Sequence, residues 1–331
     1  MKKVLIILCL FSLPVLFSTH IAPNIFYPAG FISLTVPIFI GVLILSFFYF
    51  IFSKTWWGIL PICIIAIFWS LISSSFGFHQ QDTSINREKS IRLISYNVQG
   101  FIDDTGIKTI TEQQTEISDW IDSLNTDIIC LQEVTDQANL DRLLSEYQRF
   151  FSGKTNPDNS RLGVIILSRF PIVNSGSIEF AFNSFNRSAW ADIALGKDTI
   201  RVMNVHLKSY NFKDYQGWKK ITNVRNALQA RSYHAQLLTR FIQNSPYPVI
   251  LCGDFNETPH SYVYQKLKTS LNNSFEHAGN FYQHSFKLGP IPFRIDHIFA
   301  DTRFNVLEYT THYECHWSDH YPIDVILKLV K

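Results

Sequence analysis

The first 78 residues of the chain carry almost no charge, and this feature most constrains how the chain folds. They contain Lys2, Lys3 and Lys54 but no Arg, Asp or Glu. Three apolar stretches lie within them, at residues 4–19, 31–52 and 56–74. Apolar stretches of about 20 residues match the ~30 Å hydrocarbon core of a bilayer, and these lack the polar face of a helix that covers a soluble core. We therefore expect residues 1–78 to form a membrane anchor of about three transmembrane helices.

The placement of the three lysines predicts the orientation of this anchor. Lys2 and Lys3 precede the first apolar stretch, and Lys54 lies between the second and the third. Positively charged residues beside membrane spans tend to stay in the cytoplasm, so the third span would lead outward. We expect a multi-pass protein of the inner cell membrane whose following domain is periplasmic. The first stretch also has the features of a cleaved signal peptide, and the sequence leaves that alternative open.

The rest of the chain has the composition of a soluble domain with nearly balanced charge. Of the 29 basic and 27 acidic residues, 26 and 27 respectively follow residue 78. This part is therefore not a globally basic nucleic-acid binder. None of the five cysteines has the Cys-x-x-Cys spacing of a zinc site, so we expect small buried residues. Residues 79–90 are polar without apolar periodicity and predict a linker, which leaves 91–331 as the folded domain.

Apolar runs predict a mixed α/β domain in this second part. Strands are expected at residues 91–96, 127–131, 163–167, 188–195, 199–205, 248–252, 294–300, 306–311 and 323–329. Helices are expected at residues 117–124, 140–147, 219–243 and 260–268. Gly196-Lys197-Asp198 predicts a hairpin turn between two of the strands. Many strands with a few helices indicate an α/β fold.

Polar residues follow several of the predicted strands. The stretch Cys252-Gly253-Asp254-Phe255-Asn256 places a carboxylate and a carboxamide side by side after a buried strand, although such a turn is commonly only an Asx-turn. Each of the other polar groups also has an ordinary explanation, such as a helix cap, a core histidine, an ion pair or a turn. These groups are Asn97, Glu133, His206, Asp296 with His297, and Asp319 with His320. Together they are better explained by one site at the edge of a sheet than by stability.

Six short motifs occur in a characteristic order. They are Ser95-Tyr96-Asn97, Leu131-Gln132-Glu133, Asn204-Val205-His206-Leu207, Gly253-Asp254-Phe255-Asn256, Arg294-Ile295-Asp296-His297-Ile298-Phe299 and Ser318-Asp319-His320-Tyr321-Pro322. In this order they resemble the motif series of the endonuclease/exonuclease/phosphatase superfamily, over about residues 91–331. The resemblance implies a four-layered α/β sandwich, with two mostly antiparallel sheets packed face to face and helices outside. It also implies Mg²⁺-dependent hydrolysis of phosphoesters, as in nucleases, inositol-phosphate phosphatases, sphingomyelinases and RNA deadenylases.

The resemblance assigns metal binding mainly to carboxylates. It implies Glu133 as the principal Mg²⁺ ligand, with Asn97 beside it and Asp319 near a second metal position. Mg²⁺ prefers hard oxygen ligands and keeps several waters, so one or two carboxylates suffice, and Mn²⁺ is the expected substitute. Such a metal polarises the phosphoryl oxygen and stabilises the charge of the transition state.

The same resemblance assigns the catalytic roles. Asp254 would orient, and also deprotonate, the attacking water, while Asn256 would hold a phosphate oxygen. Asp296 would orient His320 and favour its imidazolium form. His206 would stand on the other side of the scissile phosphate. The sequence leaves open which of the two histidines gives or takes the proton.

Two residues bear on the substrate through the same resemblance. Arg187 precedes a predicted strand where relatives carry a phosphate-binding arginine, and a surface arginine is the alternative. His206 stands where the abasic-site endonuclease branch has a tyrosine, whereas the deoxyribonuclease, sphingomyelinase and inositol-phosphatase branches carry a histidine. This difference argues against an abasic-site repair enzyme.

The segment after His206 is basic and rich in aromatic residues. Between residues 208 and 231, six basic residues stand against Asp214 alone. Such a segment is suited to stacking on bases, to a bilayer interface with anionic headgroups, or to a solvated helix face. We therefore expect a membrane-anchored, Mg²⁺-dependent phosphoesterase acting on nucleic acid, a phospholipid or a small phosphoester, without an obligate protein partner. The alternative is a catalytically silent binding or scaffold domain of the same fold.

Overall fold

The structure is a computed structural model that describes residues 1–79, 90–103, 106–135, 145–155, 161–180, 186–210 and 216–330. The chain divides into two compact units. The first comprises Met1–Ser75, Ser209–Arg240 and Glu257–Thr269, and the second comprises Phe76–Lys208, Phe241–Asn256 and Ser270–Lys331. Each unit is described separately.

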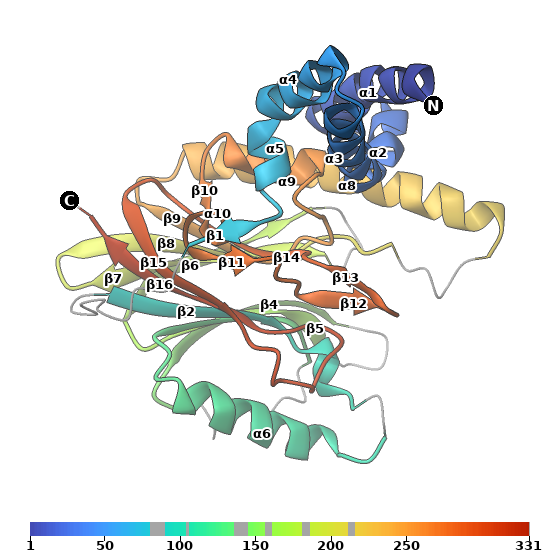
Figure 1. The fold of residues 1–331 in the computed structure, drawn as a ribbon. Coiled ribbons are helices and arrows are strands. Elements are labelled where there is room, and N and C mark those ends of the chain that lie inside the picture. Colours follow the sequence, from blue (N-terminus) through green and yellow to red (C-terminus); the bar gives the residue numbers. More distant parts are fainter. Residues whose placement is uncertain are drawn as a thin grey trace. The chain divides into compact units, whose positions relative to one another are not determined.

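The second unit is built on two six-stranded sheets that pack face to face (Figure 1). In the first sheet the strand order is β15 (Phe304–Thr311), β16 (Ile323–Leu329), β2 (Ser90–Asn97), β3 (Ile128–Thr135), β5 (Arg161–Ser168) and β4 (Gln148–Thr155). In the second sheet it is β10 (Asn272–Asn273), β14 (Asp296–Ala300), β9 (Val249–Asp254), β8 (Asp198–His206), β7 (Arg187–Leu195) and β6 (Ile172–Glu179). The predicted fold of two mostly antiparallel sheets flanked by helices is confirmed.

One parallel pair in each sheet positions the polar residues that follow the strands. β2 runs parallel to β3, with Asn97 opposite Gln132. β8 runs parallel to β9, with His206 opposite Asp254, and the antiparallel β14 places Asp296 opposite Asp254 as well. Because parallel neighbours end at the same edge of a sheet, their terminal side chains gather there.

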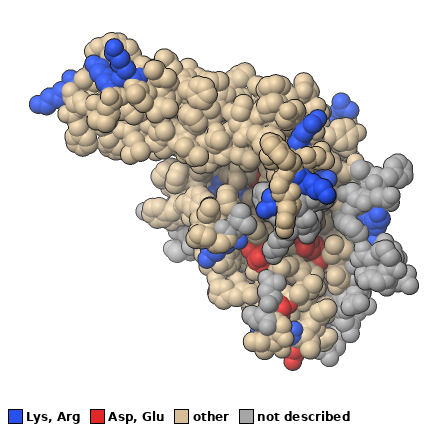
Figure 2. Space-filling view, turned by 90° about the vertical axis from the view of Figure 1, so that its right-hand side faces the viewer, with Lys and Arg blue, Asp and Glu red and all other residues tan. Residues whose placement is uncertain are grey.

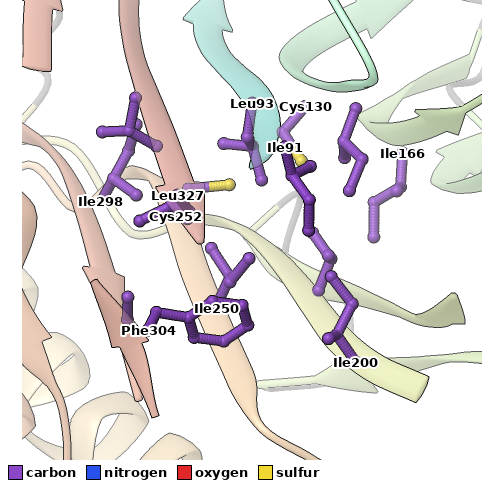
Figure 3. Packing of buried hydrophobic residues seen from close by; sticks show 14 of the residues in the cluster. Ile91, Leu93, Cys130, Ile166, Ile200, Ile250, Cys252, Ile298, Phe304 and Leu327 are labelled. Carbon is purple, nitrogen blue, oxygen red and sulfur yellow. The ribbon is translucent and has the colours of Figure 1, made fainter. Parts of the chain in front are cut away.

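Alternate residues of both sheets fill the space between them. Ile91, Leu93 and Cys130 of the first sheet pack against Ile250 and Cys252 of the second, all of them buried (Figure 3). Strand side chains alternate between two faces, so the neighbouring residues of β2 and β3 point to the outer face of the first sheet. There they pack against helix α6 (Ile110–Ser123) in a second apolar cluster.

Helix α6 starts where its sequence predicts. Thr109 and Glu112 form a capping box, in which each side chain binds the backbone N–H of the other. Ile117 and Ile121 then point inward at a spacing of four residues, toward the sheet. The helix therefore covers the outer face of the first sheet, as Figure 1 shows.

Short elements complete the second unit. They are β1 (Gly77–Phe78), η3 (Gln99–Phe101), α10 (Ser274–Ala278), β11 (Asn280–Phe281), β12 (Phe286–Leu288) and β13 (Ile291–Phe293). β1 pairs with β11, and β12 forms a hairpin with β13. The predicted linker at 79–90 falls almost entirely outside the described residues.

Most predicted strands and helices are present, with a few differences. β4 and β6 were not predicted, because β6 (IVNSGSIE) and β4 (QRFFSGKT) carry several polar or small residues instead of an apolar run. The helix predicted at 140–147 lies mostly outside the described residues. Its last residue, Tyr147, is not helical, and its buried hydroxyl donates to the Thr126 carbonyl over 2.6 Å.

The first unit is helical. It contains α1 (Lys2–Phe17), η1 (Ser18–His20), α2 (Tyr27–Ser33), α3 (Val36–Phe52), η2 (Trp56–Gly58), α4 (Ile59–Ile67), α5 (Trp69–Ser73), most of α8 (Trp218–Gln243) and α9 (Tyr262–Lys268). In Figure 2 the N-terminal helices form a long uncharged stretch with lysines at one end.

Length and apolar composition qualify part of this unit to cross a membrane. Lys2–His20 qualifies alone, and α2 with α3 qualifies as a pair that is bent by 48°. Trp56–Ile67 is apolar but shorter. A signal sequence and the core helix of a soluble protein share these properties, so the structure supports one candidate span, or two if the bent pair counts as one.

Contacts within the first unit show how its helices run. The rings of Phe11 in α1 and Phe39 in α3 are 5.8 Å apart, and the Cys9 thiol lies close to Ser46 further along α3. The residue of α1 in contact comes earlier in the sequence as the residue of α3 comes later, so the two helices are antiparallel. The start of α1 and the end of α3 therefore lie at the same end of this helix pair.

Candidate active site

Asp254, at the end of β9, lies at the centre of the site. Its Oδ2 atom is 3.1 Å from Asn97 Nδ2, 3.7 Å from His206 Nε2 and 3.8 Å from His320 Nε2. The carboxylate is buried, and burial raises the pKa of Asp254 to about 6, against the opposing attraction of His320. A buried carboxylate between two histidines can accept a proton near neutral pH.

The backbone around Asp254 requires the residue types that the sequence supplies. Gly253 has φ +136°, and a Cβ at this position would lie 2.0 Å from the Val205 carbonyl oxygen, so only glycine fits. Asn256 has φ +52° and donates its backbone N–H to Asp254 Oδ1 over 2.8 Å. Its Nδ2 donates to Asp254 Oδ2 and to the Leu207 carbonyl, both over 3.1 Å. These bonds fix the loop and the carboxylate together.

Glu133 reaches the same centre from the other sheet. It has φ +55°, and the pairing of β3 with β5 shifts register between Leu131 and Val134. This irregularity turns the Glu133 side chain toward the site, as bulges commonly do. Glu133 Oε1 accepts from Asn97 Nδ2 over 3.0 Å and lies 3.4 Å from His206 Nε2. Its side chain is 31% exposed, so the carboxylate is open to solvent.

His320 forms a close pair with Asp296. Its Nδ1 donates to Asp296 Oδ2 over 2.8 Å. Burial alone would lower the pKa of His320, but the charges of Asp296 and Asp254 outweigh it and raise the pKa to about 10. The imidazole is therefore an imidazolium at neutral pH, with its Nε2–H facing the centre of the site.

A buried serine holds the strand start that carries Asp296. Ser285 Oγ accepts from the backbone N–H groups of Ile295 and Asp296, over 3.1 and 3.0 Å. The Ser285 carbonyl accepts from the Tyr321 N–H over 2.7 Å. Ser285 thus ties both sides of the His320–Asp296 pair, and Phe286 places its ring 4.8 Å from the imidazole.

The loop that carries Asp319 is tied to the end of β2. Ser318 Oγ donates to the Asn97 carbonyl over 2.8 Å and accepts from the His320 N–H. Asp319 donates its backbone N–H to Gln99 Oε1, and its Oδ1 lies 3.9 Å from His320 Nε2. Asp319 is therefore beside the site, and its side chain is more exposed than that of Asp254.

A buried polar cluster beneath the site joins the two sheets. Gln132 Nε2 donates to Asn204 Oδ1 over 2.7 Å, to the Cys130 carbonyl over 3.1 Å and to Ser95 Oγ over 3.2 Å. Asn204 Nδ2 donates to the carbonyls of Leu131 and Ile165, both over 2.8 Å. We call Gln132, Asn204 and Ser95 the inter-sheet cluster. Its members precede Glu133, His206 and Asn97, so it fixes the distance between the strands that carry them.

Arg187 lies near the site by backbone position. It begins β7 directly opposite His206 in the register of the sheet, and its side chain is mostly buried. Burial lowers the pKa of its guanidinium. The phosphate-binding role remains a prediction.

The donor set suits a hard divalent cation around Glu133. Glu133, His206 and Asp254 place ligand atoms within 4.8 Å of one another, as do Asp254, Asp296 and His320. In the second group Asp296 is already bound to a cationic imidazole, which repels a metal ion. The first group offers a solvent-open carboxylate, and oxygen donors of this kind are preferred by Mg²⁺. Asn97 presents Nδ2 to Glu133 and uses Oδ1 to accept from the Gln99 N–H, so its carbonyl oxygen would reach a metal only after the amide turns over.

The structure thus brings together seven of the predicted residues: Asn97, Glu133, His206, Asp254, Asn256, Asp296 and His320. Gln132, Asn204, Ser285 and Phe286 also belong to the site or support it, and none of them was predicted to have a role. Gln132 and Asn204 belong to the same motifs as Glu133 and His206. Their amide side chains, close in sequence to predicted site residues, could have indicated a supporting role. Ser285 and Phe286 had no such signal, because only the pairing of distant segments brings them to His320.

The fold and the site together define a hydrolase domain of the nuclease and phosphatase type. The chain belongs to the endonuclease/exonuclease/phosphatase family, whose sequence profile matches residues 94–320. Members of this family are in general hydrolytic phosphoesterases and usually depend on a divalent metal. A second profile, a domain of unknown function (DUF8431), matches residues 3–75.

Known proteins are similar over the catalytic part. The curated carbon catabolite repressor protein 4 homolog 3 of Arabidopsis thaliana is 29% identical over 163 residues, which are 46% of this chain and 34% of that protein. The chain thus matches about a third of the length of this relative. An endonuclease/exonuclease/phosphatase structure from Bacteroides vulgatus has TM-score 0.59 and 19% identity, covering 72% of this chain and 99% of that one. The human Nocturnin catalytic domain with bound sulfate has TM-score 0.58 and 23% identity, covering 76% and 97%. At these identities the structures establish the shared fold.

Proposed function

We propose that this protein is a membrane-anchored, Mg²⁺-dependent phosphoesterase that hydrolyses phosphodiester or phosphomonoester bonds. The observation that carries the proposal is the position of Asp254, whose Oδ2 faces both His206 and His320. Two histidines that approach one carboxylate oxygen to 3.7 and 3.8 Å would bind a phosphoryl group next to an attacking water. Glu133 supplies the solvent-open carboxylate that a metal requires beside them.

Glu133 would hold the metal, with Asn97 beside it once its amide turns over, and Asp319 would lie near a second metal position. When bound, Mg²⁺ polarises the phosphoryl oxygen and offsets the negative charge of the transition state. Mn²⁺ has similar oxygen preferences and would substitute. Proton transfer and orientation of the substrate phosphate would be carried out by side chains of the protein.

Asp254 and His320 divide the proton transfer between them. Asp254, with a pKa of about 6, is ionised at neutral pH and accepts the proton of the attacking water. His320, with a pKa of about 10, is protonated and donates to the oxygen on which charge develops. His206 faces Glu133 and Asp254, and it would bind a second phosphoryl oxygen.

Two residues would orient the substrate phosphate. Asn256 is locked to Asp254 by its backbone and side-chain bonds. Its Nδ2 hydrogens already serve Asp254 and the Leu207 carbonyl, so its amide would donate to a phosphoryl oxygen in exchange for one of these bonds. Arg187, in register with His206, would add a positive charge on the same side. The bound sulfate of human Nocturnin is a tetrahedral anion like phosphate, which is consistent with an anion subsite in this fold.

The substrate class is a nucleic acid, a phospholipid or a small phosphoester. The experiment that tests the activity uses the full chain in detergent or nanodiscs, with Mg²⁺ or EDTA, on duplex DNA, RNA and phospholipid in parallel. Metal-dependent turnover of one substrate, absent in His320→Ala, would support the proposal. Turnover that persists in His320→Ala and Glu133→Ala would refute the site assignment, and a folded chain without turnover on any phosphoester would favour a silent binding domain.

The N-terminal part would be a multi-pass anchor of about three spans, with the catalytic part outside the cytoplasm. Lys2 and Lys3 begin α1, and Lys54 follows α3, so the antiparallel pair brings all three to one end. Basic residues at one end of a helical bundle favour the cytoplasmic side for that end. Alkaline phosphatase fused to the C-terminus would be active in this orientation, and a fluorescent cytoplasmic reporter at the same position would contradict it.

A further inference from the structure

Helix α8 contains no acidic residue. The chain has no Asp or Glu between Asp214 and Asp254, and α8 covers Trp218–Gln243 within that interval. Its N-terminal turns carry Lys219, Lys220 and Arg225, all exposed. A helix of this length with several cations and no carboxylate suits a negatively charged surface.

One face of α8 is the contact surface for the N-terminal helices. The guanidinium of Arg225 lies 4.5 Å from the ring of Tyr27, and Ser232 Oγ binds Asn24 Oδ1 over 2.8 Å. Between them, the side chain of Leu228 lies against Gly30. Arg225, Leu228 and Ser232 are spaced by three and four residues, so they occupy one face of the helix.

The same face continues toward the start of α8, past the last of these contacts. Ile221 lies four residues before Arg225, and Trp218 lies three before Ile221, so both fall on this face. Trp218 is 84% exposed and Ile221 is 50% exposed. In Figure 1 the yellow N-terminal turns of α8 extend beyond the blue N-terminal helices. The face of α8 that contacts the N-terminal helices therefore ends in two exposed apolar residues, Trp218 and Ile221, next to Lys219 and Lys220.

The N-terminal segment that contacts α8 also exposes apolar residues. Ile25 and Phe26, in the connection that contacts α8, are 84% and 50% exposed. This connection follows the end of α1 that is opposite Lys2 and Lys3. Aromatic side chains concentrate where a membrane meets water. The exposed Phe26 and Trp218 therefore give this part of the first unit the composition of a membrane–water interface.

We propose that the N-terminal turns of α8, which we call the α8 overhang (residues 218–225), dock on an anionic lipid surface. Trp218 and Ile221 enter the interfacial region, and Lys219, Lys220 and Arg225 attract anionic headgroups. Each basic residue near an anionic leaflet contributes roughly fivefold in affinity. The inference rests on the proposed membrane anchoring. It adds that the helix following the His206 segment is itself a lipid-binding element.

Fluorescence quenching in the full chain tests this docking. The chain is placed in nanodiscs whose lipids carry bromine near the headgroups, and the quenching of wild type is compared with that of Trp218→Phe. The difference isolates Trp218 from the other tryptophans. We expect quenching of Trp218, and stronger quenching when anionic lipid is added to zwitterionic lipid. Equal quenching of the two proteins would overturn the docking.

A charge reversal tests the anionic preference. Lys219→Glu with Lys220→Glu should remove the effect of anionic lipid on Trp218, whereas Lys197→Glu, in the exposed turn between β7 and β8, should keep it. An unchanged response in the double variant would contradict the headgroup contact. Hydrolysis of a soluble phosphoester should be the same in all variants. Co-elution of the chain with the nanodiscs tests the membrane anchoring separately from the docking of α8. A chain that does not co-elute would overturn both the anchoring and the docking. The phosphoesterase activity is tested by its own assay and does not depend on either result.

Discussion

His320 and Asp296 form a buried ion pair, with Nδ1 and Oδ2 only 2.8 Å apart. The pair raises the pKa of His320 to about 10 from an ordinary value of 6.5. The Nε2 atom of the resulting cation lies 3.8 Å from Asp254 Oδ2, at the centre of the site.

Replacing Asp296 with Asn should lower the activity by about 10²–10⁴-fold at neutral pH, because His320 then loses the charge that keeps it protonated. The pKa of His320, followed by NMR, should fall by several units. Asp119→Asn, an exposed carboxylate on α6, serves as the matched control and should change neither quantity. A normal rate in Asp296→Asn would show that the imidazolium form is not needed.

The pH–rate profile should be bell-shaped. Activity should fall as the pH drops through about 6, where Asp254 becomes protonated, and fall again as the pH rises through about 10, where His320 loses its proton. A bound cation would move the acidic limb to lower pH, so that limb should shift with metal concentration. An acidic limb that stays in place in Asp254→Asn would assign it to another group.

Stability should also depend on pH through His320. Its folded-state pKa stands above the ordinary value, so its contribution is complete below pH 6.5 and is lost as the pH rises toward about 10. In metal-free protein, the free energy of unfolding of wild type should decline over this interval more than that of His320→Gln. Parallel curves for the two proteins would mean that the imidazolium is not bound more tightly in the folded state.

Glu133→Gln should raise the Mg²⁺ concentration needed for half-maximal activity, because a neutral amide binds a hard cation less tightly than a carboxylate. Direct titration of the metal by calorimetry gives a second readout that does not require turnover. Asp119→Asn again provides the control. Unchanged metal affinity in Glu133→Gln would move the metal site elsewhere.

Arg231 and Glu257 form a buried ion pair in the first unit, 2.7 Å apart, with the ring of Tyr210 4.1 Å from the guanidinium. Arg231→Met should cost about 3–5 kcal/mol of unfolding free energy, since it leaves a buried carboxylate without its partner. Arg231→Met combined with Glu257→Gln should recover part of this loss. A double variant no more stable than Arg231→Met would mean that the unpaired charge is not the cause.

Replacing members of the inter-sheet cluster should also lower the free energy of unfolding, in this case in the second unit. Asn204→Leu leaves two buried carbonyls without their donor and should cost about 1–3 kcal/mol for each group left unsatisfied. Gln132→Leu should show a coupled effect, because the two amides share a hydrogen bond. Strictly additive losses would mean that the two amides act independently.

Much of the fold and of the site follows from the sequence alone. Apolar runs placed β2, β3, β8, β9 and β16, and the spacing of Ile117 and Ile121 placed α6. The six motifs indicated the family and the residues at the strand ends. Local patterns carry this information because the period of side-chain burial is fixed by the geometry of a strand or a helix.

The tertiary structure decided what local patterns cannot encode. It set the pKa values of Asp254 and His320, which depend on groups far away in the chain, and it brought Ser285 and Phe286 to the His320 loop. It also paired Gln132 with Asn204 across the sheets and left Trp218 and Ile221 of the α8 overhang exposed beside the N-terminal helices. A sequence fixes which groups are present and how each short segment folds, whereas burial and distance, which set charge and reactivity, arise only when remote segments pack together.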